Sequence, residues 1–245
     1  MPNLQVKDPA ERFDLAYLFA NGDAEEIKKL ADTAKEFSAR CAMVHVADLR
    51  RLAPFLEGSS VRPEVVIDFP DGLGGWQAKE AEARQAKEDG AVGGDPVINL
   101  RYVAERNRQG IIRECQLVRA QLDQVKLISQ IPYLWQKDPN AIPWILDLLP
   151  EAGVYCVKDW TTRYNFYFTK KKDGTAEKLD DTVDTRVLYT ESMPDYITKH
   201  NLPLRIKIAG GVDATNAKRF VNAGADFLGL SYGKAKSVRE ALLQK

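Results

Sequence analysis

Metal-binding and disulfide-forming residues are scarce in this sequence. It contains three cysteines, Cys41, Cys115 and Cys156, and only two histidines, His45 and His200. Three cysteines are an odd number, and none of them has the close spacing of a metal-binding pair, which favours a reducing compartment over a disulfide scaffold. With so few possible ligands, we do not expect a zinc site.

Long apolar runs and an excess of one charge sign are lacking as well. No segment approaches the roughly 20 apolar residues of a membrane span, and residues 1–5 do not begin a secretion signal. The 35 basic and 35 acidic side chains cancel, so no overall field attracts nucleic acid or an anionic membrane. We therefore expect a cytoplasmic protein without a nucleic-acid or membrane partner, in which local groups hold any anionic ligand.

Short runs rich in Val, Ile and Leu recur along the chain, with amphipathic stretches between them. This alternation is typical of a parallel sheet covered by helices. Eight runs are predicted to be strands, namely residues 14–19, 41–46, 64–69, 95–100, 125–131, 154–158, 204–209 and 226–230. A chain of 245 residues fits one α/β barrel about as well as two small domains.

The stretches between these runs show helical periodicity. After Asp23, a candidate N-cap, apolar residues from Ile27 to Phe37 recur on one face,. Further helices are predicted at residues 49–56, 76–89, 102–122, 143–149, 194–200, 215–223 and 235–243. Eight strands that are mostly apolar on both faces favour a closed (β/α)₈ TIM barrel over residues 1–245 as a single domain. An open doubly wound sheet is the alternative.

One segment, residues 164–190, interrupts the alternation. It contains the aromatic triplet Phe166 to Phe168, then Lys170, Lys171 and Lys172 before Asp173 and Gly174. We interpret it as an inserted β-hairpin with a solvated tip. Because it follows the sixth strand, where barrel enzymes place their chemistry, it is either a lid over the site or a surface insertion without a role in the reaction.

Two lysines occupy unusual positions in apolar strands. Lys158 ends the sixth run, and Lys207 lies inside the seventh. If both point into the barrel mouth, their like charge and partial desolvation would lower each pKa toward neutrality, and a neutral amine can attack a carbonyl. The alternative for each lysine taken alone is that it extends from the strand end to water.

Schiff-base chemistry also needs a proton relay and, for an anionic substrate, an anion site. Asp95 opens a buried run and is the candidate relay acid, although a solvated turn residue after Gly93 and Gly94 is the plainer interpretation,. Backbone amides at Gly210 and Gly211, after the seventh strand, are typical of a phosphate cradle,. The end of the eighth strand, from Gly229 to Gly233, is the second half of the usual phosphate grip of this fold.

With these residues in place, the chain resembles the deoxyribose-phosphate aldolase family from about Asp14 to Gly233. The matching motifs are Val157–Lys158 at the family's Schiff-base lysine, the run from Ile206 to Gly211 at its second lysine and glycine pair, and Phe69, Pro70 and Gly72 at its third-strand loop. Asp95 and Asp14 are similar to its two active-site aspartates.

The resemblance implies reversible cleavage of 2-deoxyribose 5-phosphate to glyceraldehyde 3-phosphate and acetaldehyde, with no metal or organic cofactor. Lys158 would form the imine, assisted by Lys207 and Asp95. The small phosphorylated sugar would be held by Gly210, Gly211, Arg163 and Ser231, with Gly229 beside them. Because family members often pair, a homodimer is a further expectation from the resemblance.

Several positions depart from the family pattern. Asp159, Trp160, Thr161 and Thr162 replace small hydroxyl residues and glycine after the nucleophile, Gln130 replaces a glutamate, Ala16 a threonine, and Tyr232 a serine. His45 stands where relatives often carry cysteine, so it is either a hydrogen-bonding group that faces the site or, more typically for a lone histidine, a structural residue. The departures leave two alternatives open: a Schiff-base aldolase with another aldehyde or keto-sugar substrate, and a barrel that binds a sugar phosphate without turning it over.

Overall fold

The computed structural model describes residues 4–163, 175 and 178–244. Eight parallel strands pair in chain order, and β1 closes the ring against β8. The strands are β1 (Phe13–Ala16), β2 (Cys41–His45), β3 (Arg62–Ile67), β4 (Gly93–Pro96), β5 (Gln124–Ile128), β6 (Cys156–Lys158), β7 (Arg205–Ala209) and β8 (Phe227–Ser231). The expectation of a closed TIM barrel is confirmed, and the open sheet is excluded.

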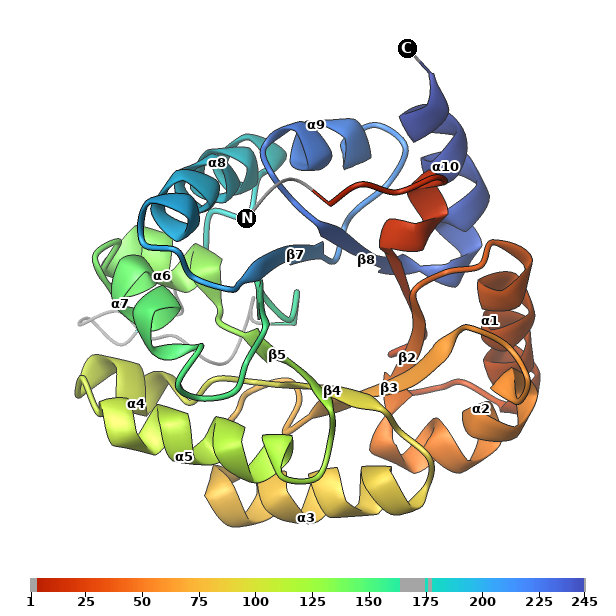
Figure 1. Ribbon diagram of the computed structural model, residues 1–245, viewed down its shortest axis with the longest axis horizontal. Coiled ribbons are helices and arrows are strands. Elements are labelled where there is room, and N and C mark those ends of the chain that lie inside the picture. The colour runs from red at the N-terminus through yellow and green to blue at the C-terminus, as the bar shows by residue number, and fades with distance from the viewer. Residues whose placement is uncertain (1–3, 164–174, 176–177, 245) are drawn as a thin grey trace.

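Helices surround the ring of strands on its outside (Figure 1). They are α1 (Ala24–Glu36), α2 (Leu49–Leu56), α3 (Gly75–Glu88), α4 (Leu100–Ala104), α5 (Arg108–Arg119), α6 (Ile131–Lys137), α7 (Ala141–Leu148), α8 (Val183–Lys199), α9 (Ala217–Asn222) and α10 (Ala235–Leu243). Asp23 caps α1 by accepting from the amides of Glu25 and Glu26,. Among the described residues, no helix is both long and apolar enough to cross a bilayer.

One expected helix is divided and one observed helix, α6, was not expected, both for local reasons. The helix expected over residues 102–122 divides into α4 and α5, because Arg106 adopts a positive φ of 53° and Asn107 caps α5 at the amide of Gly110. Helix α6 begins at Ile131, where a strand was expected to end. Gln130 has a φ of 52°, and this left-handed conformation ends the extended backbone before the helix begins,.

The prediction of a hairpin over residues 164–190 is wrong for the last part of that range. Helix α8 begins at Val183, eleven residues before the expected start at Pro194, and Thr182 caps it by accepting from the amide of Thr185. Pro194 lies inside this helix. Residues 164–174, 176 and 177, and with them the expected hairpin tip, lie outside the described residues.

The interior of the barrel has an apolar part and a charged part. One buried apolar cluster consists of Met43 on β2, Val66 on β3, Val97 directly after β4 and Ile128 on β5. Successive residues of a strand face opposite sides, so the next inward positions toward the amino-terminal ends are two residues earlier. On three of these strands those positions carry ionisable groups, namely Glu64, Asp95 and Lys126, all fully buried.

Candidate active site

Lys158 and Lys207 meet at one carboxylate. They lie opposite each other in the pairing of β6 with β7. The Nζ of Lys158 lies 3.1 Å from Oδ2 of Asp95, and the Nζ of Lys207 lies 2.9 Å from the same oxygen. Both amines are almost fully buried. The interpretation that these lysines merely extend to water is therefore wrong, and the two amines share a cavity as expected.

The two amines differ in their electrostatic surroundings. Burial, followed by the charge of Lys207, lowers the pKa of Lys158 against the opposing effect of Asp95,. Burial also disfavours the charge on Lys207, but its ion pairs with Asp14 and Asp95 outweigh this and raise the pKa of Lys207. The expectation of a lowered pKa is thus confirmed for Lys158 and wrong for Lys207. Lys158 is therefore the amine that loses its proton more readily, and Lys207 is the cation beside it.

Asp14 and Asp95 provide the negative charge of this group. Asp14, on β1, accepts from Lys207 at 2.5 Å. Burial disfavours the ionised form of both carboxyls, but Arg40 and Lys207 around Asp14, and Lys126 and Lys207 around Asp95, lower both pKa values. Asp95 is fully buried, so its interpretation as a solvated turn residue is wrong.

A cavity of about 420 Å³ opens above the lysines. Its lining residues include eight of the nine predicted site residues: Asp14, Lys158, Arg163, Lys207, Gly210, Gly211, Gly229 and Ser231. The ninth, Asp95, lies beneath the two amines and contacts them without lining the cavity. Much of the remaining wall is apolar, with Leu18, Phe19, Met43, Phe69 and Trp160 among its residues.

Glycine is required where the cavity wall turns after β7. Gly210 and Gly211 have φ values of 77° and 65°, and a Cβ on Gly210 would lie 1.7 Å from Cγ2 of Thr162,. Within the described residues, the amides of Gly211 and Val212 have no hydrogen-bond acceptor. Both residues line the cavity, so these two amides are available to an anion.

Two cations are among the residues that line the cavity. Arg163 lines it, and its guanidinium donates to the carbonyl of Leu18 at 2.6 Å. Lys234, which the sequence analysis missed, also lines it, and its Nζ lies 3.9 Å from a carboxylate oxygen of Asp213. Together with the hydroxyl of Ser231, these are groups that can hydrogen-bond an anion,.

Asp159 and Trp160, which depart from the family pattern, have separate roles. The indole of Trp160 is 3% exposed and forms part of the cavity wall. Asp159 accepts from Arg186 at 2.7 Å, from the hydroxyl of Tyr189 at 2.9 Å and from the amide of Ala209 at 2.8 Å. Arg186 in turn donates to the carbonyls of Ala209 and Gly210. A buried network therefore connects β6, α8 and the glycine turn.

Three other positions that the sequence singled out do not line the cavity. Gln130 donates to the carbonyl of Pro70 and to the hydroxyl of Thr161. Tyr232 donates to Glu26 at 2.7 Å. The Nε2 of His45 lies 3.3 Å from the carbonyl oxygen of Leu18, which agrees with a structural role.

Sequence reasoning missed the charged residues beneath the lysines. Lys126 forms ion pairs with Asp95, at 2.8 Å, and with Glu64. Arg40 binds Asp14, with its Nε 2.6 Å from Oδ1, and lies 3.5 Å from Glu64. The sequence signal that could have revealed Lys126 and Glu64 is a charged residue within a run that was predicted to be a buried strand.

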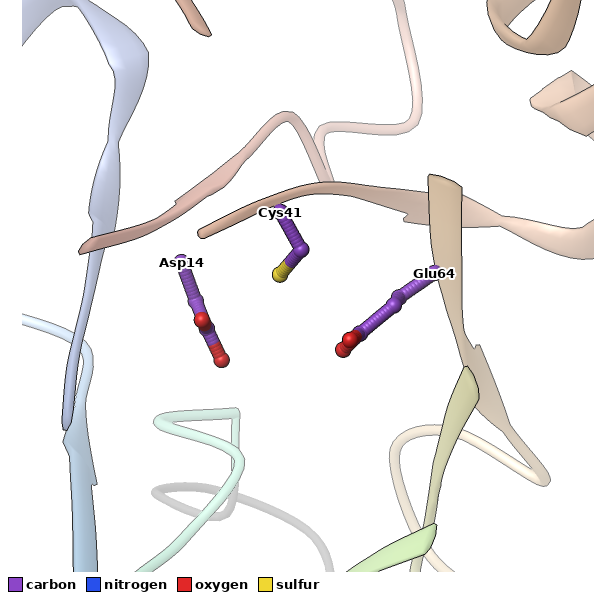
Figure 2. A group of neighbouring side chains, drawn as sticks. All are labelled: Asp14, Cys41 and Glu64. Atoms are coloured by element: carbon purple, nitrogen blue, oxygen red, sulfur yellow. The ribbon is translucent and has the colours of Figure 1, made fainter. Parts of the chain in front are cut away.

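Asp14, Cys41 and Glu64 point toward one another from β1, β2 and β3 (Figure 2). Their possible ligand atoms lie within 4.8 Å of one another. However, Arg40 and Lys126 form ion pairs with the two carboxylates. Burial and these carboxylates also raise the pKa of the Cys41 thiol well above its ordinary value. A cation would have to displace protein cations and remove a tightly held proton, so this group does not fit a metal ion.

Comparison with known proteins gives a consistent set of relatives, although no family model matches the chain. The deoxyribose-phosphate aldolase of Methanothermobacter thermautotrophicus is 30% identical, over 94% of this chain and 95% of its own length. That of Dictyoglomus turgidum is 26% identical, over 91% and 93%. Among solved structures, the tetrameric deoxyribose phosphate aldolase of Aeropyrum pernix has a TM-score of 0.75 at 25% identity, covering 95% of this chain and 89% of that one. A protein from Coccidioides immitis has a TM-score of 0.81 at 23% identity, over 99% and 89%, which supports the fold.

Proposed function

The chain belongs to the deoxyribose-phosphate aldolase family, and from this premise we propose that it cleaves 2-deoxyribose 5-phosphate reversibly through a Schiff base on Lys158. As a member of this family it is an aldolase, and so a lyase. The observation that carries the finer proposal is the pair of amines on one carboxylate. Lys158 has a lowered pKa and faces a cavity that holds the charged Lys207.

The proposed reaction begins at the aldehyde carbon of the open-chain sugar. The neutral amine of Lys158 attacks this carbon to give a carbinolamine, which loses water to form the imine. Deprotonation of the sugar hydroxyl on C3 and cleavage of the C2–C3 bond release glyceraldehyde 3-phosphate, and the electron pair of that bond remains as an enamine. Protonation of the enamine carbon and hydrolysis of the imine release acetaldehyde and restore the amine.

The residues around Lys158 match the proton transfers that these steps need. Lys207 and Asp14 line the cavity, so either can exchange a proton with bound substrate,. Asp95 acts through the two lysines, because it contacts both and does not reach the cavity. At the other end of the cavity, the amides of Gly211 and Val212, with Arg163, Ser231 and Lys234, would hold the substrate phosphate,.

Trapping of the imine is the decisive experiment. Incubation with acetaldehyde and borohydride should reduce the imine to a stable secondary amine, and peptide mapping should place it on Lys158. The Lys158→Met variant should show no adduct at this position. A folded parent protein that forms no adduct on Lys158 would instead support a barrel that binds a sugar phosphate without turning it over.

A second candidate keeps the imine and changes the substrate. It is favoured by the bulk of Trp160 in the cavity wall and by Gln130, whose side chain is held by Pro70 and Thr161 outside the cavity. Retro-aldol assays with 2-deoxyribose 5-phosphate, 2-deoxyribose and keto-sugar phosphates separate the two. Turnover of another sugar with none of the first would replace the proposed substrate and leave the imine chemistry in place.

A further inference from the structure

Seven ionisable side chains form one connected group inside the barrel. Four are basic: Arg40, Lys126, Lys158 and Lys207. Three are acidic: Asp14, Glu64 and Asp95. No side chain of this group is more than 8% exposed. Ion pairs connect Arg40, at the amino-terminal end of the barrel, through Glu64, Lys126 and Asp95 to Lys158.

The group is balanced only when one basic member is uncharged, because four basic groups face three carboxylates. An uncompensated charge in such a buried place is costly, so one member must be neutral or the surplus must be offset from outside. Within the part of the chain that the structure describes, nothing adjacent offsets it. Arg205 is paired with Asp226, and Arg62, 35% exposed and 3.7 Å from Glu64, would add positive charge.

The other ionisable neighbours are uncharged near neutral pH. Burial raises the pKa values of the Cys41 and Cys156 thiols and of the Tyr155 hydroxyl. Cys41 lies on β2, and Tyr155 and Cys156 lie at the start of β6. Within the described residues, no neighbour therefore supplies the negative charge that a fourth buried cation would need.

Lys158 is the member that loses its charge. Its Nζ contacts one carboxylate, Asp95, whereas Lys207 and Lys126 each contact two or more. Burial lowers the pKa of Lys158. Burial also disfavours the charge on Lys126, but its contacts with Asp95 and Glu64 outweigh this and raise the pKa of Lys126 well above its ordinary value.

We propose that Lys126, Glu64 and Arg40 are positioning residues of the aldolase reaction, because they complete a buried set of charges that is balanced only when Lys158 is a free amine. Glu64, whose carboxylate points into this group beside Asp14 and Cys41 (Figure 2), offsets Lys126, so that Asp95 is left to hold the two lysines of the site. The inference rests on the proposed imine at Lys158. It adds that the charge of residues that never touch the substrate sets the pH range of that imine.

The test measures the pH at which Lys158 reaches half of its maximal rate of acetaldehyde trapping. Excess cyanoborohydride makes imine formation limiting. In Lys126→Met a carboxylate is left in surplus, and protonation of Lys158 restores the balance, so the midpoint should rise by about one to three pH units. In Glu64→Gln the surplus is positive, so the midpoint should not rise.

The double variant Lys126→Met with Glu64→Gln tests the charge balance more strictly than either single variant. It removes one charge of each sign, so the midpoint should return to within about half a pH unit of the parent, although two buried residues have been changed. Lys79→Met is the matched control. Lys79 is another fully buried lysine between two carboxylates, Asp68 and Glu114, but it lies outside the barrel interior. Its midpoint should equal that of the parent.

Arg40→Gln serves if Lys126→Met does not fold, as circular dichroism would show, and it should also raise the midpoint. An unchanged midpoint in the folded single variants, or a double variant that keeps the raised midpoint, overturns the inference. A parent protein that traps no acetaldehyde overturns the proposed function instead. The two failures are therefore distinguishable.

Discussion

Lys207 carries its charge at the edge of the same cavity as the amine of Lys158. It contacts both Asp14 and Asp95, which raise its pKa despite burial. In Lys207→Leu the repulsion on Lys158 is lost and Asp95 interacts with Lys158 more strongly. We expect the pKa of Lys158 to rise by about one to three units, and trapping near pH 7 to slow by at least about tenfold.

The measurement for Lys207→Leu is the rate of acetaldehyde trapping from pH 6 to pH 10. The parent loses activity as the pH falls through the lowered pKa of Lys158, because the amine is nucleophilic only above it. The variant should lose activity at a higher pH and recover part of it in alkali. A variant that traps acetaldehyde as fast as the parent near pH 7 would refute this account of activation.

At the residue scale, the sequence revealed groups whose neighbours in the chain make them unusual. Lys158 and Lys207 stand in apolar runs, and Gly210 with Gly211 forms a visible turn motif. Lys126 and Glu64 were missed because each is meaningful only through its partner, 62 positions away. The opposite pKa shift of Lys207 was missed for the same reason, since Asp14 and Asp95 approach it only after the barrel closes.

At the scale of elements, α8 supports the anion end of the cavity although it lies outside the ring of strands. Arg186, from its first turns, is 3% exposed and holds the carbonyls of Ala209 and Gly210 as well as Asp159. These contacts turn the carbonyls toward α8, while the next two residues, Gly211 and Val212, line the cavity. Helix α8 thus positions the turn that we propose to bind the phosphate.

We expect Arg186→Met to weaken binding of the phosphorylated substrate. The KM for 2-deoxyribose 5-phosphate should rise about tenfold or more, while trapping of acetaldehyde, which has no phosphate, changes little. Arg219→Met is the control, because Arg219 forms an exposed ion pair with Asp184 of the same helix, and such pairs contribute little,. A variant with equal losses for both compounds would assign Arg186 a purely structural role.

Elements were predictable from the sequence where composition and period agreed. All eight strands were expected at overlapping positions, because parallel strands buried on both faces are mostly apolar, and the overlap is smallest for β4, whose four residues include Gly93, Gly94 and Asp95,. The start of α8 was missed because it follows a charged segment and the helix contains Pro194, a residue more often found at a helix start,. The start of α6 depends on the left-handed conformation of Gln130. The neighbouring residues in the sequence do not predict this conformation.

At the scale of the whole molecule, closure of the barrel brings together site residues from Asp14 on β1 to Ser231 on β8. Their order along the chain was informative before any coordinates, because the carboxyl ends of parallel barrel strands meet at one mouth. How deep each side chain lies in the barrel, relative to the cavity, was not predictable in this way. That Asp95 lies beneath the cavity, while Asp14 lines it, follows from the stagger between strands, which only the paired structure determines.

The closed barrel also predicts a conflict between function and stability at Lys158. The pKa of this amine is lowered in the folded protein, so between the folded pKa and the unfolded value of about 10.4 the folded state binds fewer protons than the unfolded chain,. The resulting cost is complete below the folded pKa and vanishes as the pH rises toward the unfolded value. At pH 7, Lys158 therefore destabilises the protein that it makes reactive.

Lys158→Met should remove this cost and leave three basic groups opposite three carboxylates. We expect its free energy of unfolding, measured by urea denaturation at pH 7, to exceed that of the parent by about 0.5–2 kcal/mol, and the gain to shrink as the pH approaches 10. Lys126→Met leaves Glu64 without its closest cation, so it should lose about 3–5 kcal/mol under the same conditions,. If Lys158→Met proves less stable than the parent at pH 7, the amine is charged in the resting protein, and both its activation and the charge balance around it would be refuted together.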